Sequence, residues 1–532
     1  MAAEYEEVMG ATHVERDDFG HSENNPRSTI FSSAVRPWYR MFASIAKAND
    51  WVVDDALRNV LQRSQCIVDG PDHWETELMY RCRGRGTLFL DCGLEHFPQG
   101  PEYPQLLQEL LADVKYARLS TDEEEFDVDI LPSLLSCMSN LEVVHLADTS
   151  LVRTVVAALT PVARRCLKVV TIEGSMPSAV TVKELVDCCD HLHTCDFGRP
   201  VTQDLISSLS RIAPQLQSVS LYVGTTDRLD WQPLTGACRN LRRLHICSRY
   251  GVHELDFLSR LSVAWLDGLV DLSYPLVDED LINVLKAHGH KLKSLSVKYG
   301  WGHNFAAPSV QLLATIASSC TSLRSFKLSD RSEFEPASDL THAFKALPQL
   351  RNLHINYSML AYAEIVSIGH LGNLKELTLD DVKGITDDAL CALAPQLPLI
   401  ESLSLTRIHG ISAIGVNAFI QHPNSVSKFY VDGIKELQSD AVAAAILGNS
   451  GLCRRLTEIS IAFCAGAIKC ETLRGLGHKC CKLTYLFVPA PPTPYPEEVV
   501  RLFCHQCIYY HDAGCISDGS DDGEGDGDMF DG

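Results

Sequence analysis

Four potential metal ligands lie close together near the carboxyl end of the chain. They are spaced as Cys504-x2-Cys507-x3-His511-x3-Cys515. Thiolate sulfur and imidazole nitrogen are ligands that tetrahedral zinc prefers in proteins. The spacing is similar to that of a zinc knuckle, but each of the two later gaps is one residue shorter. The expectation for the chain is that it has no cofactor, and two interpretations stay open for this segment: a zinc site, or a cysteine-rich cap that binds no metal.

Other chemistry-bearing patterns are incomplete. The acidic segment that begins at Asp518 follows the start of an EF-hand loop, but its twelfth position is Met529 instead of the bidentate glutamate. The sequence also contains no Walker loop, nucleophile elbow or HExxH motif. We therefore expect a protein that is not an enzyme and has no catalytic residues.

A different group of residues is suited to binding. Tyr222, Arg243, His245 and Trp265 lie in segments where apolar and polar residues alternate. Alternation places them on the exposed face of short strands. Tyr, Trp and Arg dominate the energetics of protein interfaces. We predict that these four residues contact a partner. The alternative is that an isolated aromatic residue covers a short, irregular repeat.

A loop supplies a second binding candidate. Tyr299, Trp301 and Phe305 follow a predicted strand and lie among glycines, in a repeat that is longer than the average. Insertions in repeat proteins go to loops, which often carry the binding residues. The alternative is that the three rings fold back over the edge of the next repeat.

The elements that must position these residues come from a recurring phrase, Leu-x-x-Leu-x-Leu. It is plain at Leu350-x-x-Leu353-x-Ile355, Leu374-x-x-Leu377-x-Leu379 and Ile400-x-x-Leu403-x-Leu405, and it returns with a mean period of about 26 residues. A weak copy between Leu241 and Leu292 is placed at 261–266. Looser copies begin at Leu141, Leu167, Leu192, Leu216, Leu241, Leu292, Leu323, Val426, Leu456 and Leu483, and two earlier strands are predicted near Leu88 and Val114.

Each copy predicts one strand and one helix. The Leu-x-Leu core has period two, which is typical of a strand, and the residues that follow have a helical period. Thr386 and Thr202 are predicted helix N-caps, and Thr181 with Glu184 fits a capping box. The helices end in Cys-x-x-Leu, where a small apolar thiol fills the seam before the next strand. These cysteines are Cys189, Cys238, Cys320, Cys453 and Cys480.

The combination of Ile385-Thr386-Asp387-x-x-Leu390 helix starts, leucine-rich strands and Cys-x-x-Leu helix ends resembles the cysteine-containing repeats of F-box/LRR proteins. The resemblance covers roughly residues 110–490. It implies an α/β leucine-rich repeat solenoid, a curved horseshoe with parallel strands on the concave face and helices on the convex face. It also implies a substrate-recognition subunit of a cullin-type ubiquitin ligase. The alternative is a scaffold subunit of a larger assembly with no ligase role.

An F-box would lie just before the repeats. Residues 52–61 resemble its first helix, but the Leu-Pro opening and the Val-Cys-x-x-Trp segment are missing. Residues 36–84 are therefore predicted to be a helical cap or a degenerate F-box, and in the second case they would bind the cullin-ligase adaptor. The other predicted boundaries are a disordered tail at 1–35, the solenoid at 85–490, a C-terminal cap at 491–515 and a disordered acidic tail at 516–532.

The charge and composition limit the partners. The formal net charge is −22, which disfavours nucleic acid because phosphate binding needs a basic surface. No apolar stretch is long enough to cross a membrane, and the acidic start does not resemble a signal peptide. The 20 cysteines are then expected to be reduced thiols, in the cytoplasm or the nucleus. We expect a protein partner on the concave face or the adjoining loops, and neither nucleic acid nor membrane.

Overall fold

The computed structural model divides into two compact units, residues 1–323 and 324–532. The structure describes residues 88–93, 114–120, 135–136, 138–146, 151–172, 179–223, 229–248, 263–275, 279–298, 310–329, 340–422, 424–489, 495–496, 499, 502 and 507–511.

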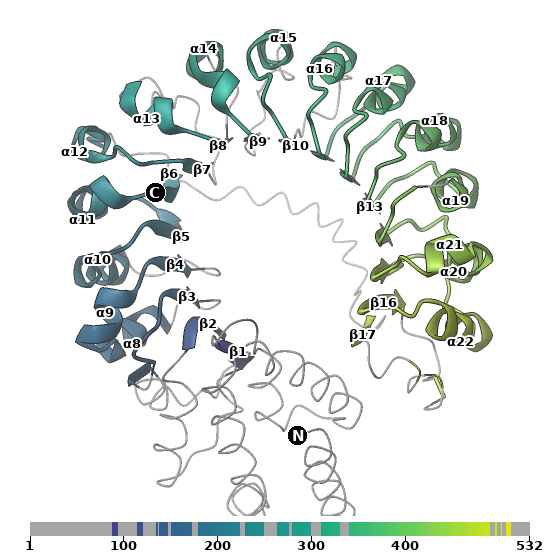
Figure 1. Ribbon diagram of the computed structural model, residues 1–532, viewed down its shortest axis with the longest axis horizontal. Coiled ribbons are helices and arrows are strands. Elements are labelled where there is room, and N and C mark those ends of the chain that lie inside the picture. The colour runs from purple at the N-terminus through teal and green to yellow at the C-terminus, as the bar shows by residue number, and fades with distance from the viewer. Residues whose placement is uncertain are drawn as a thin grey trace, which may run out of the picture. The chain divides into compact units, whose positions relative to one another are not determined.

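The first unit contains a parallel sheet in which each strand pairs with the next one along the chain (Figure 1). Two parallel strands need a crossover between them, and most of the crossovers here contain a helix. The strands are β1 Leu88–Gly93, β2 Val114–Ser120, β3 Val143–Leu146, β4 Val169–Ile172, β5 Thr194–Pro200, β6 Ser218–Val223, β7 Arg243–Ser248, β8 Asp271–Tyr274 and β9 Ser294–Lys298.

The helices of the first unit form a second layer on one side of its sheet, as Figure 1 shows. Several neighbouring helices contact each other from one repeat to the next, as do the neighbouring strands. The helices are α8 Leu151–Ala158, α9 Pro161–Cys166, α10 Ala179–Cys188, α11 Gln203–Ile212, α12 Gln232–Ala237, α13 Val263–Gly268, α14 Glu279–His288 and α15 Val310–Ser319.

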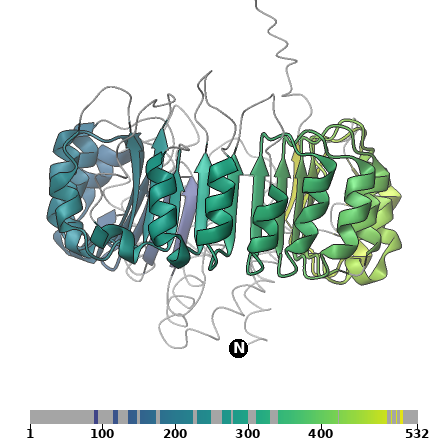
Figure 2. The ribbon, with the colours of Figure 1, turned by 90° about the horizontal axis from the view of Figure 1, so that it is seen from above.

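The second unit repeats this two-layer arrangement, with its strands parallel and in sequential order (Figure 2). Its strands are β10 Ser325–Ser329, β11 Asn352–Asn356, β12 Glu376–Asp380, β13 Ser402–Thr406, β14 Lys428–Asp432, β15 Glu458–Ser460, β16 Tyr485–Pro489 and β17 Cys507–His511. Its helices are α16 Leu340–Ala346, α17 Tyr362–Ser367, α18 Asp387–Leu393, α19 Ala413–Gln421, α20 Ser439–Gly448, α21 Ser450–Cys453 and α22 Cys470–Lys479.

The core lies between the two layers of each unit. Leu377 and Leu403 pair in register on β12 and β13, and both are 0% exposed. Leu379 and Leu405 form the next buried pair in the same way. The predicted fold class, an α/β leucine-rich repeat solenoid with parallel strands on one face and helices on the other, is confirmed by this pairing and burial.

The cysteine prediction is also confirmed. All five cysteines of the Cys-x-x-Leu signature are buried at the junction between a helix and the next strand. The packing around Cys320 is tight, because a Cβ atom added at Gly289 would lie 2.9 Å from its sulfur. Burial raises the pKa of the Cys320 thiol to about 12, so the neutral form is favoured. These cysteines are structural.

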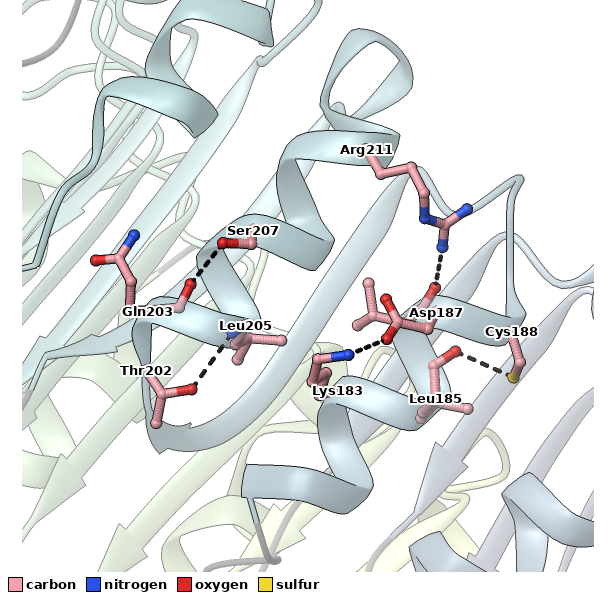
Figure 3. Close-up of polar contacts among 10 residues, drawn as sticks. Lys183, Leu185, Asp187, Cys188, Thr202, Gln203, Leu205, Ser207 and Arg211 are labelled. Atoms are coloured by element: carbon pink, nitrogen blue, oxygen red, sulfur yellow. Dashed lines mark hydrogen bonds and ion pairs between the residues drawn. The ribbon is translucent and has the colours of Figure 1, made fainter.

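Two of the three predicted helix starts are confirmed. The Thr202 hydroxyl accepts a hydrogen bond of 3.3 Å from the Leu205 amide (Figure 3), and the Thr386 hydroxyl accepts one of 3.3 Å from the Ala389 amide. The capping box at Thr181 is wrong. Helix α10 already begins at Ala179, so Thr181 lies inside its first turn instead of preceding it.

The strand predicted at 261–266 is wrong. That segment overlaps helix α13, and the strand of this repeat is β8. The true copy of the repeat phrase is Leu269-x-x-Leu272-x-Tyr274, in which a fully buried tyrosine replaces the third leucine. Trp265 therefore belongs to α13 and does not lie on the exposed strand face beside Arg243, as the sequence had suggested.

The proposed segments outside the repeats are mostly untested. The tails at 1–35 and 516–532 and the cap or F-box at 36–84 lie outside the described residues. Strands β1 and β2 occur where two early repeats were predicted, and β17 continues the parallel ladder inside the segment 491–515 that was predicted to be a cap. Within the described segments, no helix has the length and apolar character needed to cross a membrane.

Candidate functional site

The exposed strand face of the second unit is the best-defined surface on which a partner could dock. Along each strand the leucine-type residues are buried and the residues between them are partly exposed. The register aligns the exposed residues into rows that cross the sheet. The central row is Lys327, His354, Thr378, Ser404, Tyr430, Ser460 and Phe487. Ser460 is the buried member of this row, at 2% exposure.

Backbone strain marks the carboxyl edge of this face. Tyr357, Asp381, Arg407 and Phe463 have φ values of 52°, 52°, 51° and 56°, in the left-handed region that favours glycine. The first three directly follow strands β11, β12 and β13, where Gly433 follows β14 with a φ of 69°. Gly433 shows that glycine suits the left-handed backbone at this position after the strand. A side chain kept at such a position is a reason to look for a function.

The strained residues also extend the hydrogen-bond ladder between repeats. The amide of Tyr357 donates to the carbonyl of Asp380 at 2.9 Å, and the amide of Arg407 donates to the carbonyl of Asp432 at 2.8 Å. Each turn is thereby tied to the end of the next strand. Their side chains are held along one edge of the sheet as a result.

Arg407 is the central charged residue of this edge. Its Nη2 atom lies 2.8 Å from Oδ1 of Asp380 and donates a bond of 3.0 Å to the Tyr357 hydroxyl. Its guanidinium also lies 5.5 Å from the centroid of the Tyr357 ring, a cation–π distance. Burial raises the pKa of Asp380, although the charge of Arg407 opposes this shift. The trio is a fixed polar patch that reaches across three repeats.

An aromatic cluster lies at the other end of the same face. We define it as Tyr430, Phe463, Tyr485 and Phe487. The rings of Phe463 and Phe487 meet edge to face at 6.3 Å and 74°, and those of Tyr485 and Phe487 are tilted by 41° at 6.5 Å. Phe463 is 43% exposed and has a left-handed backbone. Exposed rings of this kind are typical of binding surfaces.

Carboxylates border the aromatic cluster. The Tyr430 hydroxyl donates a hydrogen bond to Glu458, which is also 2.5 Å from Nζ of Lys428. Oδ1 of Asp432 accepts hydrogen bonds from the Ser460 hydroxyl at 2.6 Å and the Ala462 amide at 2.8 Å. Rings and carboxylates thus share one part of the surface.

The ionisation of these groups follows from their surroundings. Burial raises the pKa of Asp432, against the effect of its two hydrogen bonds. Burial, together with the charges of Asp432 and Glu458, also raises the pKa of Tyr485. For Glu458, burial acts upward, but the hydrogen bonds from Lys428 and Tyr430 outweigh it and lower the pKa. Glu458 is therefore a carboxylate at neutral pH.

Three of the predicted partner-binding residues come together on the first unit. Tyr222 lies on β6, and Arg243 and His245 lie on β7, all on the exposed face of that sheet. The Ser220 hydroxyl is 3.0 Å from Nδ1 of His245, whose Nε2 atom is 3.1 Å from the sulfur of Cys247. Trp265 is not part of this group, because it belongs to helix α13.

Two further sets of predicted site residues come from the loop after β9 and from the carboxyl end of the chain. Tyr299, Trp301 and Phe305 lie outside the described residues, as do Cys504 and Cys515. Cys507 and His511 are the first and last residues of β17. Within the described part of the chain, no group of three or more His, Cys, Asp or Glu side chains is arranged to hold a metal. The zinc interpretation stays a prediction.

The alternation of apolar and polar residues along β14 and β16 is enough to place Tyr430 and Phe487 on the exposed strand face, but it does not reveal the cluster that they form with Phe463 and Tyr485. Phe463 lies beyond the strand pattern, in a turn whose left-handed backbone has no local signature. The nearest signal was Gly433, which occupies the equivalent turn one repeat earlier.

Comparisons with known proteins add little to this description. No family model matches the sequence, and no curated protein matches it. Solved structures with detectable similarity include a chain of the Rad7 and Elc1 complex in yeast, at 14% identity and a TM-score of 0.40, covering 88% of this chain and 94% of that one.

Two further structures are similar at the same low level. An internalin from Listeria monocytogenes has 15% identity and a TM-score of 0.27, covering 71% of this chain and 88% of that one. The TLR13–ssRNA13 complex gives 12% identity and a TM-score of 0.29, covering 74% of this chain and 59% of that one. The assignment of the chain to the leucine-rich repeat class rests on its own strand pairing and buried leucines.

Proposed function

We propose that this chain is a protein-binding solenoid, not an enzyme, and that its partner docks on the exposed strand face of the second unit over the aromatic cluster. One observation carries the proposal. Phe463 stays partly exposed in a backbone conformation that favours glycine, and its ring contacts Phe487 on the strand face. Folding alone would favour a glycine at this turn, so the ring is retained for a contact with another molecule.

The chemistry of the cluster favours a basic partner segment. Aromatic faces attract the guanidinium of arginine or the ammonium of lysine, and the energy is larger where water is excluded. Asp432 and Glu458 beside the rings add acceptors for the same cation. The net charge of −22 adds a long-range attraction for a basic protein. The preferred partner is therefore a protein segment that inserts an arginine or a lysine among these rings.

The finer proposal is a substrate-recognition subunit of a cullin-type ubiquitin ligase. Its support is the resemblance of the repeat motifs, including the Thr386 cap and the buried Cys-x-x-Leu cysteines, to F-box/LRR proteins. In that case residues 36–84 would bind the ligase adaptor and the strand face would bind the substrate. The alternative proposal is a scaffold subunit that uses the same face without any adaptor.

Affinity purification of the tagged full-length chain from native extract, followed by mass spectrometry, tests both the docking of a partner on the aromatic cluster and the ligase role. We expect the double variant Phe463→Ala and Phe487→Ala to recover at least about tenfold less of the principal partner. Tyr362→Ala is the matched control, because this tyrosine is 53% exposed but belongs to helix α17 on the opposite layer. The control should recover the partner at the wild-type level.

Two results would count against the proposal. Equal recovery with the double variant would exclude the aromatic cluster as the docking surface. A cullin-ligase adaptor absent from both wild-type and variant preparations would exclude the ligase role and favour the scaffold. Recovery of the adaptor should not depend on the aromatic cluster, so the docking surface and the ligase role are tested separately.

A further inference from the structure

We propose that Cys247 on β7 is a reactive thiol and a modification site for small electrophiles, with His245 as its base and Ser220 as the residue that positions the imidazole. The inference does not depend on the binding role proposed above. It concerns the first unit, whose exposed strand face carries all three side chains.

The contacts have the arrangement of an activated nucleophile. The sulfur of Cys247 lies 3.1 Å from Nε2 of His245, and the Ser220 hydroxyl lies 3.0 Å from Nδ1 of the same ring. When Nδ1 carries the hydrogen and donates it to Ser220, Nε2 accepts the thiol proton. After proton transfer, the imidazolium donates to both the thiolate and the hydroxyl. An activated thiol is typically in contact with a base, which is in turn oriented by a third group. Cys247, His245 and Ser220 have this arrangement.

The backbone fixes this geometry. Ser220 and His245 are direct partners in the register between β6 and β7, and Cys247 follows two residues later on the same face of β7. Paired strands are rigid elements, so the imidazole is held between its two neighbours. Cys247 is also partly exposed, which leaves its sulfur open to a small reagent.

A second observation marks the surroundings of the ring. Ser273 on β8 pairs with His245 in the register, on the side opposite Ser220. Its hydroxyl oxygen is buried and makes no hydrogen bond within the described structure, and the residue is only 9% exposed. An unsatisfied buried hydroxyl is costly. The Ser273 hydroxyl can therefore form a hydrogen bond with a polar atom of the group that an electrophile attaches to Cys247.

The other described cysteines provide the contrast. Burial raises the pKa of the thiol to about 12 for both Cys238 and Cys320, so these residues stay protonated and inaccessible. The hydrogen bond from Cys189 lowers the pKa of Cys188, but that thiol donates to the Leu185 carbonyl instead of facing an imidazole. Cys391 is exposed on helix α18 and serves as an unassisted reference.

The reaction with iodoacetamide is balanced as follows. His245 accepts the thiol proton at Nε2, and the thiolate sulfur attacks the methylene carbon of the reagent. A carbon–sulfur bond forms, the carbon–iodine bond breaks, and iodide leaves with the electron pair. Hydrogen peroxide would react at the same sulfur: the thiolate attacks one peroxide oxygen, the oxygen–oxygen bond breaks, the sulfur becomes the sulfenic acid, and the other oxygen leaves as hydroxide or water.

The test is limited alkylation of the folded full-length chain with iodoacetamide, with each cysteine quantified by peptide mass spectrometry. At pH 7, Cys247 should react about tenfold or more faster than Cys391, even though it is the less exposed thiol. His245→Gln should reduce the rate at Cys247 to that of Cys391. It should also make the rate fall more steeply between pH 8 and pH 6.5, which a general loss of structure would not do.

Ser220→Ala is the second variant, and it tests the activation of Cys247 if His245→Gln fails to fold. It should slow Cys247 by about threefold to tenfold while leaving Cys391 unchanged. The proposal is overturned if wild-type Cys247 reacts no faster than Cys391. It is equally overturned if the folded variants alkylate Cys247 at the wild-type rate.

Discussion

Asp387 and Ser412 join two consecutive repeats of the second unit through two hydrogen bonds to one carboxylate. Oδ1 of Asp387 accepts a bond of 2.8 Å from the Ser412 amide, and Oδ2 accepts one of 2.6 Å from the Ser412 hydroxyl. Oδ1 also accepts a bond of 2.9 Å from the Gly415 amide. The first turn of helix α18 thus caps the amino end of helix α19, which satisfies amides that have no partner within the helix.

The same device recurs later in the unit. Oδ1 of Asp440, in the first turn of α20, accepts bonds from the Lys469 amide at 3.0 Å and the Thr472 hydroxyl at 2.7 Å, at the start of α22. An aspartate placed early in one helix therefore couples its repeat to the next one. In a one-dimensional array such contacts contribute to the interface energy between neighbours.

Replacement of this carboxylate should destabilise the fold. We expect Asp387→Ala to cost about 1–2 kcal/mol in the free energy of unfolding, the range for loss of a helix cap. Asp388→Ala is the matched control, because Asp388 is the next residue in the same turn and is exposed. Chemical denaturation of both variants measures the difference. Equal stability of the two variants would mean that the bonds to Ser412 and Gly415 contribute nothing.

The contribution of Asp387 should depend on pH. Burial acts to raise the pKa of this carboxyl, but the hydrogen bonds from Ser412 and Gly415 outweigh it and lower the pKa below its usual range. Its stabilisation is then complete above the unfolded pKa of about 3.9 and is lost as the pH falls through the lower folded value.

The stability gap between wild type and Asp387→Ala should therefore be constant from pH 7 to about pH 5 and should shrink below about pH 4. Denaturation series at several pH values, with both proteins in parallel, measure this gap. A gap that grew as the pH fell would show that the folded state prefers the protonated carboxyl, contrary to this account.

A substitution in the buried core of a repeat should lower the free energy of unfolding by more than the loss of the Asp387 carboxylate. Leu377→Ala should cost about 2–5 kcal/mol, because it removes buried methyl groups and leaves a cavity between β12 and the helical layer. Leu399→Ala is the control, since Leu399 is 45% exposed. Urea denaturation of the two variants should separate them clearly. A cost below about 1 kcal/mol for Leu377→Ala would mean that the repeat relaxes around the loss.

Phe463→Gly separates function from stability. Glycine relieves the left-handed strain at this turn, which is worth about 1 kcal/mol, and offsets much of the lost contact with Phe487. The melting temperature should stay within a few degrees of wild type, while partner recovery falls about tenfold or more. The reverse outcome, a large loss of melting temperature with unchanged partner recovery, would make Phe463 a structural residue.

Much of the architecture could be read from local patterns. The spacing of Leu377 and Leu379 within one strand, the cap at Thr386 and the helix-ending cysteine at Cys320 each lie within a few residues of the element that they define. Burial follows the period of the local element, two for strands and 3.6 for helices, so the repeating unit is visible in the sequence.

The local pattern predicted the wrong strand in the repeat that follows β7. Residues 261–266 looked like a repeat copy, but the strand forms at β8, where Tyr274 takes the place of a leucine. Pairing with β7 decided between them, because Asp271, Leu272 and Ser273 align with Arg243, Leu244 and His245. A short apolar run alone does not distinguish a strand from a helix.

The sequence by itself determined the repeat, the solenoid class and the structural role of the buried cysteines. Only the tertiary structure decided which side chains meet on the strand faces. Phe463 meets Phe487, and Ser220 meets His245, because stacking brings residues about one repeat apart into direct contact. Such contacts depend on the strand register and on the conformation of the turns, and a shift of one residue would turn each side chain to the opposite face.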